Sequence, residues 1–360
     1  MIEKTIGTPF RRIMAAVLVV LLATFGLAGA AGAKAKSKPS KIQTKVVDRG
    51  SLRCGISGFQ PGFSLLQEDG SYTGLDADMC RAVAAAVLGD ANAVEYIELA
   101  TFERLEAVID GKVDVLMRLT TNTLGRDAGL PLNFGPSIFY DGRSLMVNLP
   151  GVTEGSGFEA LNDASVCVQA SDGSEEFVLD EADEAGVIVT TVSADGIFDA
   201  IEKLSLGECD AVTADRSVLA GIRAFVDLPG AEDWVILAET FSKEPLAPVV
   251  VEGDDGWLAT VSWVVNATFF AEESGIDSDN IDVVLAGTPS LAVSLAFGDD
   301  AGALAAQLGL GADWAYRVIS QVGNYAEIHA ANLDPIGLIR AGSLNQSYVD
   351  GGLQYSPPFR

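Results

Sequence analysis

The stretch Val113-Asp-Val-Leu-Met117 decides the fold, because it completes an alternation of strands and helices. It is short and apolar, which is typical of a strand buried within a sheet. The apolar patterns before it predict, in order, a strand over 51–57, a helix over 76–88, a strand over 94–99 and a helix over 102–110. This β-α-β-α-β succession predicts a parallel sheet with helices on its faces.

The same alternation returns further along the chain. It predicts strands over 165–169, 187–192 and 211–213, with helices over 175–185 and 196–205 between them. The turns from helix to strand also match, since Asp110-Gly-Lys-Val-Asp-Val-Leu116 resembles Leu206-Gly-Glu-Cys-Asp-Ala-Val212. We therefore expect an α/β protein with two lobes, each a mainly parallel sheet flanked by helices.

Two further segments connect the lobes. Residues 141–147 and 241–249 predict two strands that cross between the lobes, so the first lobe would be discontinuous. Helices are expected near 256–274, 299–309 and 311–333. The expected organisation is a signal peptide over 1–33, a tether over 34–48, the first part of lobe 1 over 49–143, lobe 2 over 144–244, and the return to lobe 1 with a C-terminal helical extension over 245–360.

The N-terminus is typical of an export signal. Lys4, Arg11 and Arg12 precede an apolar run over 13–27, and small residues at 28–33 offer cleavage sites, of which we favour the one after Ala33. A twin-arginine signal and an uncleaved anchor are the alternatives, although the apolar run is short for a membrane span. The segment after it is basic and predicts a flexible tether. We expect a soluble, periplasmic protein.

Composition excludes several classes of function. The formal net charge of −27 would repel nucleic acid and anionic membrane surfaces. His329 is the only histidine, and we expect it on the surface of a helix, so a Ser-His-Asp triad has no other candidate base. There is no histidine cluster for a metal and no phosphate-binding P-loop. We expect no metal, no cofactor and no enzymatic activity, although a catalytic pair of carboxylates stays open.

The four cysteines are an even number in a chain expected to be exported, which favours disulfides. Three pairings are possible. We expect Cys54–Cys80 and Cys167–Cys209, because each pair then stays within one αβ half. Buried free thiols are the alternative.

The candidate ligand residues follow the predicted strands. In open α/β sheets, ligands lie beyond the carboxyl ends of the strands. Arg126 can bind a carboxylate with two parallel hydrogen bonds, Thr121 can add a hydroxyl, and backbone N–H groups at the helix start near Ser174 favour the same anion. Asp215 follows the strand over 211–213 and can accept hydrogen bonds from an ammonium group. Together these groups suit a zwitterion, while the alternatives are a surface pair of Arg126 with Asp127 and a helix cap at Asp215.

Longer motifs cover roughly residues 49–360. They are Arg49-Gly-Ser-Leu-Arg-Cys-Gly-Ile56, Pro61-Gly-Phe-Ser64, Gly74-Leu-Asp-Ala-Asp-Met-Cys-Arg-Ala-Val-Ala-Ala-Ala86, Val113-Asp-Val-Leu-Met-Arg-Leu-Thr-Thr-Asn-Thr-Leu-Gly-Arg-Asp127, Ser242-Lys-Glu-Pro-Leu246, Gly253-Asp-Asp-Gly-Trp257, Asp313-Trp-Ala-Tyr-Arg-Val-Ile319, Gln321-Val-Gly-Asn-Tyr325 and Gly351-Gly-Leu-Gln-Tyr-Ser-Pro-Pro-Phe-Arg360. By these motifs the chain resembles the periplasmic substrate-binding proteins of general and polar L-amino acid ABC transporters.

The resemblance implies a type II periplasmic binding fold that closes on a free L-amino acid and delivers it to an inner-membrane permease. It implies that Arg126 binds the ligand's carboxylate, with Thr121 as its hydroxyl neighbour, and that Asp215 binds the ammonium group. Phe63 and Phe102 are weaker candidates for the wall around the ligand's side chain. We expect a monomer.

Two stretches depart from the family pattern. The chain has Leu119-Thr-Thr-Asn-Thr123 where the family usually has Asn-Thr-Thr-Trp-Thr, so Asn122 replaces the tryptophan. It has Ser171-Asp-Gly-Ser-Glu175 where the family usually has a Gly-Thr-Thr-Thr-Glu-like turn, so Asp172 places a carboxylate where the family offers threonine. Asp172 would repel the ligand's carboxylate, favour a cationic side chain, or point to solvent. The alternative functions are a periplasmic enzyme on this fold, such as a dehydratase of a prephenate-like substrate, and a ligand-sensing partner of a receptor.

Overall fold

The computed structural model describes residues 40–170, 173–228 and 230–360. The expected signal peptide and the first part of the expected tether lie outside these residues. The rest of the expected tether is helical, as α2 (Lys41–Arg49), because the Ser40 side chain accepts a hydrogen bond from the backbone N–H of Gln43 and Gly50 ends the helix in the left-handed conformation. The buried side chain of Val46 anchors this helix to the core.

Lobe 1 is the part of the molecule built on a five-stranded sheet with the strand order β5-β1-β6-β15-β7. The strands β1, β5 and β6 are parallel, whereas β15 runs antiparallel to β6 and β7. The predicted strands and helices are confirmed, with shorter bounds at β6 and α4. The elements are β1 (Leu52–Ile56), β5 (Val94–Glu98), β6 (Val115–Leu116), β7 (Leu132–Phe134), β15 (Val249–Val251), α3 (Leu75–Leu88), α4 (Arg104–Ile109) and α5 (Leu124–Asp127), with a small sheet of β2 (Phe59–Gln60), β3 (Ser64–Leu66) and β4 (Tyr72–Thr73).

Lobe 2 is the part built on a second sheet with the order β11-β10-β12-β9-β13, in which β10, β11 and β12 are parallel. The strand predicted from residue 187 begins only at residue 190, because the backbone N–H and carbonyl of Ile188 bond to the preceding loop at Asn162 and Asp163. The elements are β9 (Arg143–Val147), β10 (Ser165–Gln169), β11 (Thr190–Ala194), β12 (Ala211–Asp215), β13 (Val235–Ile236), α6 (Ser174–Ala185), α7 (Ile197–Ser205) and α8 (Arg216–Phe225).

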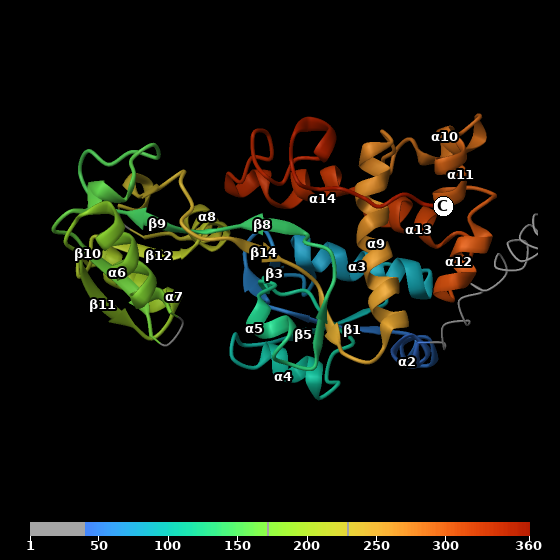
Figure 1. Ribbon diagram of the computed structural model, residues 1–360, viewed down its shortest axis with the longest axis horizontal. Coiled ribbons are helices and arrows are strands. Elements are labelled where there is room, and N and C mark those ends of the chain that lie inside the picture. Colours follow the sequence, from blue (N-terminus) through green and yellow to red (C-terminus); the bar gives the residue numbers. More distant parts are fainter. Residues whose placement is uncertain (1–39, 171–172, 229) are drawn as a thin grey trace, which may run out of the picture. The chain divides into compact units, whose positions relative to one another are not determined.

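A separate pair of antiparallel strands, β8 (Phe139–Asp141) and β14 (Glu244–Leu246), joins the two sheets (Figure 1). The single crossing strand predicted over 141–147 is divided at Gly142 into β8 and β9. A Cβ atom at Gly142 would lie 2.6 Å from the carbonyl oxygen of Ser242, so the return segment passes too close for any side chain there. Glycine therefore lets the two connections run side by side.

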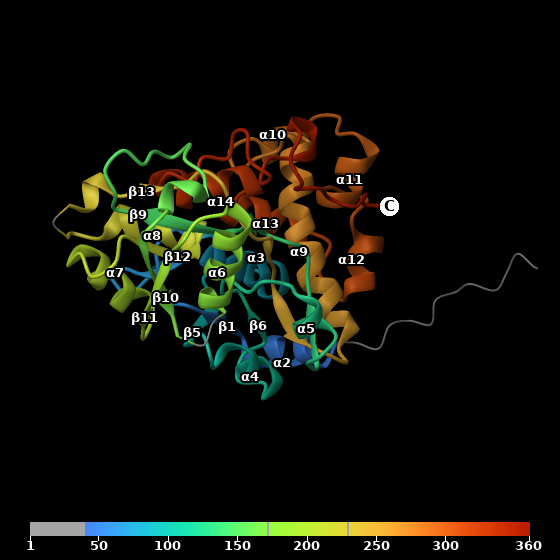
Figure 2. The ribbon, with the colours of Figure 1, turned by 60° about the vertical axis from the view of Figure 1, so that its left-hand side comes forward.

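The C-terminal part is helical, as predicted, but it is divided more finely. Its helices are α9 (Asp255–Glu273), α10 (Ile281–Ala286), α11 (Leu291–Phe297), α12 (Gly302–Leu308), α13 (Trp314–Val322) and α14 (Tyr325–Asn332), followed by 3-10 turns at Asp334–Ile336 and Tyr348–Asp350. Lobe 2 contains further 3-10 turns at Phe158–Leu161 and Ala231–Asp233. The prediction of one helix over 311–333 is wrong. Gly323 has a φ of 104°, and Asn324 starts α14 with a capping box to Glu327. Helices α9 and α13 pack against α3, as both views show (Figures 1 and 2).

Both expected disulfides are present. Cys54–Cys80 joins β1 to α3 with a Cα–Cα distance of 6.0 Å, and Cys167–Cys209 joins β10 to the turn before β12 with 5.8 Å. Each bond stays within one lobe. In the described part of the chain, no helix combines the length and the apolar character that a membrane span needs.

Candidate functional site

The loop after β6 is held firmly on both sides. Arg118 turns inward, where its Nε donates to the carbonyl of Leu99 at 2.8 Å and a terminal nitrogen donates to Thr101 Oγ1 at 3.1 Å. The carbonyl of Thr120 accepts a hydrogen bond from the backbone N–H of Ala247, and Thr121 forms an antiparallel bridge with a residue of β14. The loop is therefore attached to the strand segment that returns from lobe 2, and Thr121 is buried.

Arg126 lies in the short helix α5, which Thr123 caps. One terminal nitrogen of its guanidinium donates to the carbonyl of Thr121 at 2.8 Å. Among the described residues Arg126 forms no ion pair, not even with Asp127, which removes the alternative of a surface pair. The guanidinium is thus oriented by the loop while keeping donors for an anion.

Arg104 is a candidate site residue that the sequence analysis missed. It is the first residue of α4, only 9% of its surface is exposed, and its buried Nε has no hydrogen-bond partner among the described residues. Burial, and next the charges of Arg118 and Arg126, lower its pKa to about 9, while the Asp215 carboxylate acts in the opposite direction. The group is charged at neutral pH, so a cluster of guanidinium groups forms in a chain of net charge −27. Such a cluster suits a ligand with more than one carboxylate.

The helical pattern carries one signal for Arg104. The side chain of residue 104 lies on the same helix face as Val108, four positions on, and Val108 is buried. An arginine on the inward face of a short helix is a polar group placed at a buried position, and such a group requires a partner.

Asp215 ends β12 and stands at the N-cap position of α8, where its side chain makes no capping hydrogen bond. Asp215 therefore does not act as a side-chain cap of α8, which was the alternative interpretation. In the antiparallel pairing of β12 with β9, Asp215 lies opposite Arg143. Asp215 is also close enough to Asp141 for its charge to influence that carboxyl group.

Asp141, at the end of β8, accepts hydrogen bonds from the hydroxyl and the backbone N–H of Ser217 and from the N–H of Gly142. Burial, and next the Asp215 carboxylate, raise the pKa of Asp141 to about 8. Two acidic groups thus lie together where β8 enters lobe 2. A cationic group placed between them would favour the ionised form of both.

The remaining predicted residues differ in exposure. Ser174 is fully buried at the start of α6, where its Oγ accepts a hydrogen bond from Arg143 at 2.6 Å. Phe63 is fully buried in the core, with its ring 5.4 Å from that of Phe139. Phe102 is 84% exposed, just before α4. Asp172 lies outside the described residues.

His329 is not on the surface, as the sequence analysis expected. It is buried in α14, and burial, together with the charge of Arg340, lowers its pKa to about 4. Within the described ranges no group of three or more histidine, cysteine or acidic side chains is arranged to hold a metal ion.

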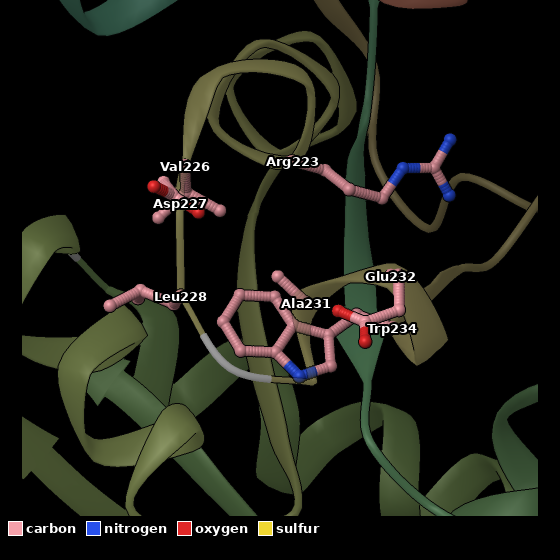
Figure 3. A pocket seen from close by; sticks show the side chains of 7 residues that line it. All are labelled: Arg223, Val226, Asp227, Leu228, Ala231, Glu232 and Trp234. Carbon is pink, nitrogen blue, oxygen red and sulfur yellow. The ribbon is translucent and has the colours of Figure 1, made fainter.

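A pocket of about 360 Å³ lies in lobe 2, and none of the candidate residues described above lines it (Figure 3). It is lined by Arg223, Val226, Asp227, Leu228, Ala231, Glu232 and Trp234. The guanidinium of Arg223 points away from the Trp234 indole (Figure 3). Because the lining combines this arginine with two exposed carboxylates, it shows no preference for an anion.

The chain is similar to known solute-binding proteins. Residues 52–150 match the family described as bacterial extracellular solute-binding proteins, family 3. The "Putative amino-acid ABC transporter-binding protein YhdW" of Escherichia coli (strain K12) is 39% identical over 88% of this chain and 91% of its own length. The "Glutamate/glutamine/aspartate/asparagine-binding protein BztA" of Rhodobacter capsulatus is 39% identical over 94% of this chain and 99% of its own. The "General L-amino acid-binding periplasmic protein AapJ" of Rhizobium johnstonii is 36% identical over 92% and 96%.

Solved structures of solute-binding proteins are also similar to this chain. An ABC transporter or periplasmic binding protein from Brucella ovis with glutathione bound has a TM-score of 0.81 and 36% identity, covering 88% of this chain and 99% of that one. An ancestral arginine-binding protein bound to arginine has a TM-score of 0.50 and 28% identity, covering 63% and 94%. The expected type II periplasmic binding fold is confirmed. The chain belongs to the bacterial extracellular solute-binding proteins of family 3.

Proposed function

We propose that this protein captures a free L-amino acid between its two lobes and delivers it to the permease of an ABC transporter. One observation carries the proposal. Arg126, without an ion-pair partner among the described residues, follows strand β6 of lobe 1, and Asp215 ends β12 of lobe 2. These are equivalent edges of the two sheets, where ligands of α/β folds bind. The names of YhdW, BztA and AapJ support the same function.

Each group has a proposed role. Arg126 binds the α-carboxylate with two hydrogen bonds, and Thr121 lies beside it. Asp215 accepts hydrogen bonds from the α-ammonium group. Ser174 begins α6, whose N-terminal N–H groups favour an anion. Closure would bring residues 144–244 towards residues 49–143 and 245–360, and the ligand's binding energy would stabilise the closed state.

Arg104 restricts which amino acids the site would bind. Since Arg126 suffices for the α-carboxylate, the buried guanidinium of Arg104 is left to bind a carboxylate or an amide oxygen of the ligand's side chain. We therefore propose acidic amino acids and their amides as ligands, a class that matches the name of BztA. Phe102, exposed beside α4, stays a candidate for the wall around this side chain, whereas a fully buried Phe63 supports that wall from behind.

The remaining expectations belong to the same proposal. The protein acts as a monomeric binder rather than as an enzyme, in the periplasm, after removal of residues 1–33. The enzymatic alternative predicts a product, and the receptor alternative predicts a protein partner other than a permease. Co-purification with an ABC transporter permease would separate transport from the receptor alternative.

Thermal unfolding tests the function directly. Residues 34–360 are refolded to remove bound ligand and heated with single amino acids or glutathione. A ligand that binds only the folded protein adds about 2.7 kcal/mol at a hundredfold excess over Kd. We expect glutamate, aspartate or their amides to raise the Tm most. A larger rise with arginine or lysine would instead implicate Asp172, and no rise with any amino acid would contradict the proposal.

A further inference from the structure

The ligand loop contains a strained residue. Leu119, between Arg118 and Thr120, has a φ of 39°, in the left-handed region that leucine rarely adopts. Among the described residues, only one other non-glycine residue, Asp163, has a positive φ. The left-handed conformation costs a residue with a side chain about 1–2 kcal/mol. Other contacts must therefore stabilise this turn.

The carboxylate of Asp76 makes a contact that stabilises the turn at Leu119. Its Oδ2 accepts a hydrogen bond from the backbone N–H of Leu119 at 3.3 Å, and Asp76 is only 1% exposed. On the preceding side, Arg118 is fixed by its bonds to Leu99 and Thr101 and interacts electrostatically with Asp76. On the following side, Thr120 Oγ1 donates to the carbonyl of Arg118 at 2.8 Å. The turn is thus held from both sides, with Asp76 at its centre.

The fold itself does not explain a carboxylate at this position. Asp78, two residues further along α3, forms an ion pair with Arg81 and accepts a hydrogen bond from Asn332. Asp76 forms no ion pair within the described part of the chain, and burying a carboxylate disfavours its charged form. Its place in the first turn of α3 offsets part of this cost through the helix dipole. The remaining cost of burying this carboxylate is offset by its hydrogen bond to the turn at Leu119.

The turn determines where the binding groups lie. After Leu119 the chain joins the return strand, where Ala247 N–H donates to the carbonyl of Thr120. The next carbonyl, that of Thr121, accepts the hydrogen bond that orients Arg126. A change of conformation at Leu119 would therefore move both groups that we assign to the ligand's carboxylate.

We propose that Asp76 is a positioning residue of the ligand site: its buried carboxylate holds the left-handed turn at Leu119 and thereby aims Thr121 and Arg126 at the ligand. The inference rests on the proposed function, since the loop is taken as the carboxylate site. If a variant loses the turn in its free state, ligand binding must restore it. The free energy needed to strain Leu119 then lowers the affinity. A cost of about 1–2 kcal/mol corresponds to a loss of about 5- to 30-fold.

Calorimetry on variants of residues 34–360 tests this. We expect Asp76→Ala to weaken every amino acid ligand by this factor, whatever its side chain, because the α-carboxylate is common to all. Asp76→Asn keeps an oxygen that accepts the Leu119 bond and should bind within about threefold of the wild type. Glycine adopts a positive φ readily, so the double variant with Leu119→Gly should bind more tightly than Asp76→Ala alone. Asp78→Ala is the matched control, which should lower the Tm without changing the affinity.

Hydrogen exchange supplies a readout that does not depend on ligand binding. The amide of Leu119 should be protected in the wild type and in Asp78→Ala, and should exchange faster in Asp76→Ala. If the wild-type protein binds no amino acid, this result still decides whether Asp76 holds the turn, and the failure then belongs to the proposed function. Wild-type affinity in Asp76→Ala, or an unprotected Leu119 amide in the wild type, would overturn the inference.

Discussion

Replacing Arg104 by glutamine should change which amino acids bind. The guanidinium is almost fully buried, its Nε has no partner among the described residues, and Arg118 and Arg126 disfavour its charge. A side-chain carboxylate would be its counterion in the closed protein. Removing one partner of a buried, hydrogen-bonded charge pair costs about 2–5 kcal/mol, which is about 30- to 4,000-fold in Kd.

The assay is isothermal titration calorimetry at pH 7 with L-glutamate, L-glutamine and L-alanine. We expect Arg104→Gln to weaken glutamate by this factor and glutamine much less, because the new side chain can still donate a hydrogen bond to an amide oxygen but brings no charge for a carboxylate. The affinity for alanine should change by less than about threefold, because its methyl side chain cannot accept a hydrogen bond from Arg104.

The control is Arg53→Gln, which removes the same charge from lobe 1 at a partly exposed ion pair with Glu95. It should leave all three affinities unchanged, since exposed pairs contribute about 0–1 kcal/mol. The reasoning is refuted if Arg104→Gln weakens glutamate and alanine equally, or if it leaves glutamate unaffected.

Four further outcomes follow from the same structure. Arg126→Ala should weaken every amino acid by about 100-fold or more, and Arg126→Lys less, because lysine keeps the charge but loses the paired bonds; near-wild-type affinity by calorimetry would exclude the assigned role. Asp215→Asn should weaken amino acids far more than analogues without the amine, and an equal loss for both would contradict the ammonium assignment. Replacing Cys167 and Cys209, which are 42 residues apart, with serine should lower the free energy of unfolding by about 3–4 kcal/mol in urea titrations; an unchanged midpoint would argue against this. Because burial raises the pKa of Asp76 from 3.8 to about 7, its stabilising contribution is complete below pH 4 and is lost as the pH rises through 7. Relative to Asp76→Asn, the wild type should therefore lose about 1.4 kcal/mol per pH unit between pH 4 and 7, whereas parallel urea-denaturation profiles would show that this carboxyl does not titrate there.

The alternation of strands and helices was readable from the sequence because each element has its own apolar period. The disulfides could be predicted for a related reason, since each joins segments that are close in the chain and belong to the same lobe. The division at Gly142 was not readable, because its cause is the approach of Ser242, which only the folded chain brings near. Gly323 was likewise hidden within an apolar pattern that continues on both sides of it.

The site divides in the same way. Arg126 and Asp215 could be found because they follow predicted strands at the edge where ligands bind. Arg104 was harder to find: its spacing from Val108 places it on the inward face of α4, but an arginine near the start of a short helix is expected to face water. His329 shows the same limit: its burial depends on contacts with Phe139, which is distant in sequence. Sequence patterns report local periodicity, whereas the burial of a single polar side chain is decided by partners that are distant in the chain.

The order of strands in lobe 1 governs how the chain can fold as it is made. Strand β15 lies between β6 and β7, so this sheet stays divided until residue 251 has been synthesised. Lobe 2 draws its sheet only from Arg143–Val147 to Val235–Ile236 and can complete it earlier. Until β15 has been made, β6 keeps an unpaired edge, and such edges pair readily with other chains. A chain stopped after lobe 2 would therefore carry one finished lobe beside one that is prone to aggregate.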